Sequence, residues 1–175
     1  MAKTSGGVRR GVTSHPTVMP VKTAGGALAR HLKGLEDDPA YFNRNTERLY
    51  VFNQDGSLDY TLSQHNENQV RLNSRQRHRL ADKILVHNHP SGGPFSKGDI
   101  LMAIQYNLAE VRATGKFGTY IMRRPERGWP TTENSTTLKN IYLSTLIGMP
   151  ISEAGWKLIA DHFGADYAFV KRQMF

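Results

Sequence analysis

The sequence predicts a mixed α/β fold of the α+β type, in which a small β-sheet is flanked by helices. Two observations predict this class. Short runs of β-branched and aromatic residues are separated by turn signals before residue 90, and apolar residues recur at helical spacing after residues 96 and 135. A chain of 175 residues can bury one core but is short for two independent ones. We therefore expect one compact domain with extensions.

The N-terminal segment is expected to lie outside that domain. Residues 1–20 mix Gly, Ser, Thr and Arg without periodicity, which predicts a flexible basic tail or a linker. A short helix is expected over 23–35, weakened by Gly25 and Gly26. The domain itself is expected to span residues 21–134.

A hairpin is expected next. Residues 49–52 and 58–62 are rich in β-forming residues and flank Asn53-Gln54-Asp55-Gly56-Ser57, a turn signal, so they predict an antiparallel pair of strands. Residues 69–72 predict a further strand, and residues 74–82 a basic helix that leads into the apolar run 84–86.

The second half of the chain predicts more helix than strand. Apolar residues at 100, 101, 104, 108 and 111 predict an amphipathic helix that begins at Ser96 and ends near Gly115. A strand is expected over 117–122 and a turn over 125–130. Two helices, 135–147 and 151–163, divided by Gly148-Met149-Pro150, are expected to form a C-terminal helical extension, 135–175, packed on the same domain.

The most informative segment is His87-Asn88-His89-Pro90-Ser91-Gly92-Gly93-Pro94-Phe95-Ser96-Lys97-Gly98-Asp99. Side chains two residues apart in a strand share a face, so His87 and His89 project together. Proline and glycine then force a turn, and Asp99 stands three residues after Ser96, at the start of the predicted helix. Ser96 and Asp99 can also form a capping box, but capping does not explain two histidines on one strand face.

Two histidines and an aspartate predict a zinc site. Imidazole nitrogen and carboxylate oxygen are good zinc ligands, and a catalytic site typically has three protein ligands and leaves a fourth position for water. A structural site would normally recruit a fourth ligand, usually cysteine, and the chain contains no cysteine. The pattern therefore favours an open, catalytic Zn²⁺ site formed by His87, His89 and Asp99.

These residues resemble the signature of the JAMM or MPN+ metalloproteases (JAB domain): an upstream Glu, His-x-His-Pro, a loop, and Ser-x-x-Asp. The order His-Asn-His-Pro-Ser-Gly is most similar to the bacterial RadC branch and to JAB domains of phage head-morphogenesis proteins and bacterial toxins. The loop before Ser96 is one residue shorter than the usual family form, so it should lie tighter over the metal. The resemblance covers 47–123 and implies a JAB-like small sheet flanked by helices.

The resemblance also implies residue roles. Glu47, just ahead of the first strand, would take a proton from the zinc-activated water and return it to the leaving amine, and Ser96 would donate a hydrogen bond to the oxyanion. Glu36 and Glu67 are the other upstream glutamates, and Asp59 is a weaker candidate. The implied activity is hydrolysis of an amide bond in a protein or peptide, or of an isopeptide bond in a ubiquitin-like conjugate.

The formal charge of +8 keeps a second class of function open. A basic domain attracts nucleic acid, acidic protein surfaces or anionic membranes. The alternative is therefore a non-peptidase, RadC-like or phage-assembly module that binds DNA or a structural partner through its basic surface. The cluster 75–79, shortly before the metal motif, could hold DNA or an acidic substrate near the site. An HNH nuclease is a superficial match, because its motif residues are dispersed and these are contiguous.

The chain carries no membrane signal. No apolar run approaches the ~20 residues needed to cross a bilayer, and the N-terminus lacks the pattern of a secretory signal. We expect a soluble, cytoplasmic protein of bacterial or phage origin, with a secreted toxin domain as the alternative, and no membrane partner.

Overall fold

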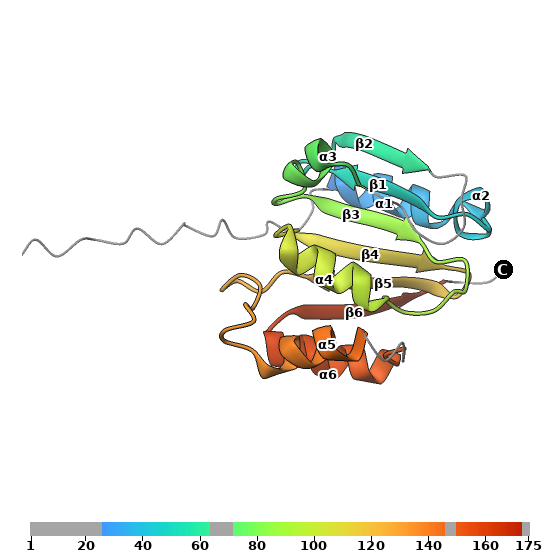
Figure 1. The fold of residues 1–175 in the computed structure, drawn as a ribbon. Coiled ribbons are helices and arrows are strands. Elements are labelled where there is room, and N and C mark those ends of the chain that lie inside the picture. The colour runs from blue at the N-terminus through green and yellow to red at the C-terminus, as the bar shows by residue number, and fades with distance from the viewer. Residues whose placement is uncertain (1–25, 64–71, 146–149, 173–175) are drawn as a thin grey trace, which may run out of the picture.

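The computed structural model describes residues 26–63, 72–145 and 150–172, and within these residues the centre of the fold is a six-stranded sheet with the order β2-β1-β3-β4-β5-β6 (Figure 1). Only β3 and β4 pair in parallel, and the other neighbours are antiparallel. The strands are β1 (Arg48–Phe52), β2 (Leu58–Ser63), β3 (Ile84–Asn88), β4 (Glu110–Gly115), β5 (Gly118–Arg123) and β6 (Asp166–Lys171). The expected mixed α+β class is confirmed.

Helices cover both faces of this sheet. Leu28 and Leu32 pack on one face, together with residues of β1 and β3. On the other face residues of α4, α5 and α6 contribute to the larger core, and Figure 1 shows α4 in front of the sheet and α5 and α6 next to β6. The helices are α1 (Gly26–Glu36), α2 (Pro39–Phe42), α3 (Ser74–His78), α4 (Lys97–Gln105), α5 (Thr136–Thr145) and α6 (Glu153–Phe163).

The expected hairpin is confirmed as β1 and β2, and the strand expected over 117–122 is confirmed as β5. The helices expected at 23–35, 135–147 and 151–163 correspond to α1, α5 and α6 in their described parts. The tail 1–20 and residues 69–71 of a predicted strand lie outside the described residues. Leu72 has no regular structure, and α3 is shorter than the helix expected over 74–82.

The prediction that the helix after Ser96 continues to near Gly115 is wrong. Helix α4 ends at Gln105, and Asn107 adopts a left-handed conformation (φ 53°) that breaks the helix. Val111 lies in β4, which pairs with β3 on one side and β5 on the other. The apolar spacing suggested one helix because the buried residues of α4 and of β4 face the same core.

The sequence analysis expected the C-terminal segment to be helical, and this prediction is wrong for its last part, which forms a strand. After α6, Gly164 takes the left-handed conformation (φ 69°) that commonly ends a helix. The chain then forms β6, which pairs with β5 along its full length and is one of the two edge strands of the described sheet, opposite β2. The alternation of Tyr167 and Phe169, both packed on the larger core, is a strand signal that could have predicted β6.

None of the helices in the described ranges is both long and apolar enough to cross a membrane.

Candidate metal centre

Four side chains converge at the end of the sheet where β3 ends and α4 begins. One ligand atom from each of Glu47, His87, His89 and Asp99 lies within 4.8 Å of the corresponding atoms of the others. His87 Nε2 is 2.9 Å from His89 Nε2 and 3.2 Å from Asp99 Oδ1. His89 Nε2 is 3.3 Å from Asp99 Oδ2, and Glu47 Oε1 is 3.9 Å from His87 Nε2. The structure thus brings the three predicted ligands and the predicted base together.

Strand β3 and its continuation set the direction of the two histidines. Every residue of β3 is buried, and His87 lies between Leu49 of β1 and Ala113 of β4. His89 follows the strand, and its N–H donates to the carbonyl of Thr114 at 2.7 Å, so the pairing with β4 continues past β3. The two imidazoles therefore emerge on the same side, as the alternation in the sequence predicted.

The N-terminus of α4 holds the aspartate. The expected capping box is present: the N–H of Ser96 donates to Asp99 Oδ2 at 2.7 Å, and the N–H of Asp99 donates to Ser96 Oγ at 3.3 Å. The same carboxylate therefore caps the helix and faces both histidines. Capping and metal binding are compatible uses of Asp99, because the carboxylate has enough lone pairs for both.

Asn88, between the two histidines, holds the segment that carries Glu47. Its Oδ1 accepts the N–H of Arg48 at 2.6 Å, and its Nδ2 donates to the carbonyl of Thr46 at 3.1 Å. The Asn88 side chain is fully buried, so both hydrogen bonds are shielded from water. Sequence reasoning missed this residue, since its partners are distant along the chain.

Electrostatics couple the aspartate to the histidines. Burial by itself would raise the pKa of Asp99, but the charge of His87 and hydrogen bonds from both histidines outweigh burial and hold that pKa well below its usual value. Burial would lower the pKa of His89, yet its hydrogen bond to Asp99 and the charge of Asp99 raise that pKa above the ordinary value. The cluster therefore favours an ionised carboxylate and attracts positive charge.

The donor set fits a zinc ion. The Gly93 carbonyl lies 3.2 Å from His89 Nδ1 and can only accept, so Nδ1 carries the proton and a neutral His89 directs the lone pair of Nε2 into the cluster. Two carboxylates then face this lone pair, and such a group of acceptors needs a cation or protons between them. Tetrahedral zinc with bonds of 2.0–2.1 Å separates its ligand atoms by about 3.3 Å. The separations of 3.2 and 3.3 Å between histidine nitrogens and Asp99 oxygens match this spacing, and the 2.9 Å between the two histidine nitrogens is shorter than it.

Comparisons with family models, curated proteins and solved structures found no match. We therefore infer function from the geometry of the site itself.

The other acidic candidates lie elsewhere. Glu36 of α1 forms an ion pair with Arg112 at 2.8 Å, and Asp59 of β2 forms ion pairs with Lys83 and Arg79. Glu67 lies outside the described residues. The basic cluster 75–79 lies around α3, at the start of β3, whereas the metal cluster lies at the end of that strand (Figure 1). The fold therefore does not bring this cluster next to the metal centre.

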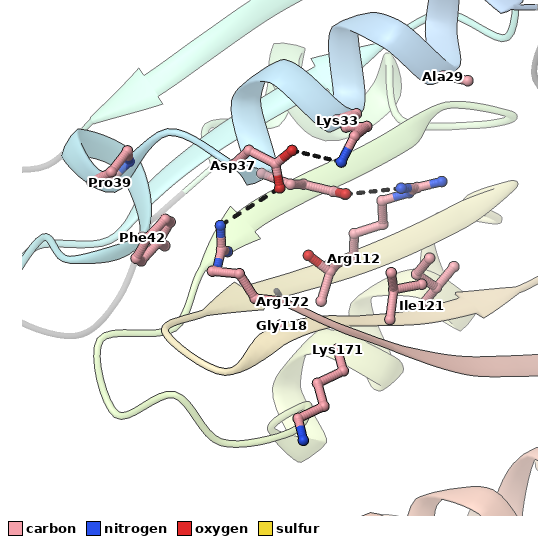
Figure 2. A pocket seen from close by; sticks show the side chains of 13 residues that line it. Ala29, Lys33, Asp37, Pro39, Phe42, Arg112, Gly118, Ile121, Lys171 and Arg172 are labelled. Carbon is pink, nitrogen blue, oxygen red and sulfur yellow. Dashed lines mark hydrogen bonds and ion pairs between the residues drawn. The ribbon is translucent and has the colours of Figure 1, made fainter. Parts of the chain in front are cut away.

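A cavity of about 1160 Å³ lies beside α1, on the face of the sheet that is opposite to α4 (Figure 2). Three ion pairs line it: Lys33 with Asp37 at 2.7 Å, Arg112 with Glu36 at 2.8 Å, and Arg172 with Asp37 at 3.7 Å. None of the four cluster residues lines this cavity, so it is separate from the metal centre.

Proposed function

We propose that the chain is a zinc-dependent hydrolase of amide bonds, of the JAMM metallopeptidase type. One observation carries the proposal: Glu47, which comes before the first strand, joins His87, His89 and Asp99 in a single cluster. In a closed structural site a carboxylate in the fourth position would itself be a ligand, but Glu47 lies farther from His87 than Asp99 does, at 3.9 Å against 3.2 Å. A glutamate next to an open coordination position is what amide hydrolysis by zinc requires.

His87, His89 and Asp99 would hold the metal. When bound, zinc supplies Lewis-acid chemistry, since it lowers the pKa of a water ligand toward ~7 and polarises the substrate carbonyl. The hydrogen bond from His89 to Gly93 and the capping contacts of Asp99 would keep both ligands aimed at the metal.

Glu47 is the residue we assign as general base. Its carboxylate is farther from His87 than that of Asp99, at 3.9 Å against 3.2 Å, and its side chain is more exposed. It can therefore accept a proton from water and return it to the leaving amine without being a metal ligand. General-base help of this kind contributes roughly 100- to 10,000-fold to the rate.

Ser96 is the residue we assign to the oxyanion. The hydrogen bond that it accepts from the N–H of Asp99 uses an oxygen lone pair, so the hydroxyl proton can be donated to a developing negative charge. Loss of one such donor commonly costs on the order of 100-fold or more in rate. The substrate class that we propose is a peptide, or a ubiquitin-like protein joined through an isopeptide bond to lysine.

The test compares wild type, Glu47→Gln and a control, Glu126→Gln, whose glutamate is exposed in a turn. Each is loaded with zinc and assayed on a peptide library and on isopeptide-linked substrates. We expect Glu47→Gln to keep the zinc content and thermal stability of wild type and to lose at least about 100-fold in hydrolysis. Glu126→Gln should behave as wild type. Equal cleavage by Glu47→Gln and wild type would contradict the assignment of the base.

The alternative is a binding module of RadC-like or phage-assembly type, which the net charge of +8 favours. In that case zinc-loaded wild type would cleave no substrate, and both wild type and Glu47→Gln would bind DNA with an affinity that falls steeply with salt. This result would contradict the peptidase proposal and favour the binding module.

A further inference from the structure

The C-terminal helix α6 contacts the loop that carries the metal ligands. Trp156 lies near the start of α6 and is fully buried, and its indole Nε1 donates a hydrogen bond to the carbonyl of Phe95 at 2.7 Å. Phe95 lies in the loop that follows His89 and directly precedes Ser96, the N-cap of α4. A buried indole N–H needs an acceptor, and here the acceptor is the backbone of the metal loop.

The side chain of Phe95 is held by the same part of the chain. Its ring is buried and makes edge-on contacts with Trp156, with Tyr120 of β5 and with Tyr167 of β6, at centroid distances of 6.5, 6.4 and 6.5 Å. The carbonyl of Phe95 is therefore held by α6, and its ring by α6, β5 and β6. The strands β5 and β6 lie toward the edge of the sheet opposite β2. Edge-on aromatic pairs of this kind favour one ring orientation.

Phe95 is connected to the proposed ligand Asp99 through its neighbour Ser96. Ser96 follows Phe95 directly, and its N–H holds Asp99 Oδ2 at 2.7 Å. The beginning of the loop has a different anchor, the hydrogen bond from the N–H of His89 to Thr114 in β4. The loop is thus fastened to β4 at its start and to α6 at its end.

We propose that Trp156 is a positioning residue for the metal centre: by holding the Phe95 carbonyl it keeps the Ser96–Asp99 turn, and hence the Asp99 carboxylate, aimed at the metal. This inference rests on the proposed metal site and deepens it. Residues that orient metal ligands typically contribute roughly 10- to 100-fold to metal affinity. Helix α6, which belongs to the C-terminal extension expected from the sequence, would thereby support the site.

The test is Trp156→Phe, which keeps an aromatic ring in the core and removes the N–H donor. The matched control is Trp129→Phe, because Trp129 Nε1 donates to the carbonyl of Leu108 at 2.8 Å, just beyond the other end of α4. Each variant loses one indole hydrogen bond to a backbone carbonyl. Zinc affinity is measured by competition with a chelating dye, and the visible spectrum of bound Co²⁺ reports the geometry of the ligands.

We expect Trp156→Phe to bind zinc roughly 10- to 100-fold more weakly and to show an altered Co²⁺ spectrum, and Trp129→Phe to match wild type in both. A wild-type zinc affinity in Trp156→Phe, or an equal loss in both variants, would overturn the inference and leave the proposed function standing. If wild type bound no zinc, the proposed function would fail together with the inference.

A second variant keeps the inference testable if Trp156→Phe does not fold. Phe95→Leu retains the carbonyl acceptor but removes the ring that packs against α6 and β6. It should also weaken zinc binding and change the Co²⁺ spectrum. Zinc affinity equal to that of wild type in a folded Phe95→Leu would contradict the role assigned to this anchor.

Discussion

The side-chain amide of Asn88 holds the backbone on both sides of Glu47. It accepts from the N–H of Arg48 and donates to the carbonyl of Thr46, while its two neighbours in sequence are the proposed histidine ligands. The strand that supplies the ligands therefore also sets the position of the proposed base. In the proposed site, the distance between the base and the metal would therefore depend on one buried amide.

Asn88→Ala should separate hydrolysis from metal binding. The substitution leaves a buried N–H and a buried carbonyl without their partner, which costs roughly 1–3 kcal/mol of stability for each group. Because Glu47 loses its alignment, we expect hydrolysis to fall by about 100-fold, while zinc content stays near one per chain. Steady-state kinetics and metal analysis check both. Asn140→Ala, at an exposed position of α5, is the control, and unchanged hydrolysis in Asn88→Ala would contradict the role of this amide.

Removal of any single ligand should release the metal. Purified protein is expected to hold about one zinc per chain, and His87→Ala, His89→Ala and Asp99→Ala should each lose most of it, since sites with three protein ligands rarely tolerate the loss of one. Metal analysis after dialysis measures the loss, and Glu47→Gln serves as the variant that retains zinc. A ligand variant with full zinc occupancy would show that this ligand is misassigned.

Zinc affinity should fall as the pH falls. A histidine must be neutral to bind zinc, and in the metal-free cluster the pKa of His89 is raised by Asp99. Proton competition therefore begins above the ordinary histidine value of ~6.5 and should weaken binding by up to about tenfold per pH unit for each proton displaced. The pKa of Asp99 is held low, so its carboxylate stays ionised over this range. An affinity that stays constant from about pH 8 to about pH 5 would argue against histidine ligation.

Gly115→Ala should disturb the metal loop from the side of β4. A Cβ at Gly115 would lie 2.6 Å from the Cα of Gly92, a separation that real structures do not tolerate, so the loop would have to move. We expect a loss of roughly 1–3 kcal/mol in the free energy of unfolding and weaker zinc binding. Gly34→Ala is the matched control, since a Cβ there meets nothing within 4 Å and the position lies inside helix α1. That control should be neutral or stabilising by up to about 1 kcal/mol. Thermal unfolding and the dye competition assay check both variants.

The candidate metal cluster could be predicted from sequence because its three proposed ligands lie within one short segment. Strand alternation fixes how His87 and His89 point, and the capping geometry fixes Asp99, so local rules suffice. Glu47 is indicated only by its position ahead of the first strand and by the family resemblance, and the fold is needed to bring it to the cluster.

The remaining contacts depend on neighbours that the sequence does not reveal. Asn88 and Trp156 act on segments far from them along the chain, and neither residue type indicates a partner. Strand β4 was missed because its apolar residues continue the helical spacing of α4, and both elements bury the same side. The alternation in β6 is visible in the sequence, but the two helices predicted before it led to the whole segment 135–175 being predicted as a helical extension.

The burial of the four cluster side chains is graded, from 1 % exposed for His87 to 13 % for His89 and 19 % for Glu47. Glu47 and His89 are the most exposed members, so in the proposed site water, substrate and metal would reach the cluster from the side of these two residues. A chelator would have to approach past Glu47 and His89, and a substrate bound at the site would stand in its way. Occupancy by substrate would then slow the loss of zinc, and the metal would be retained best while the protein is at work.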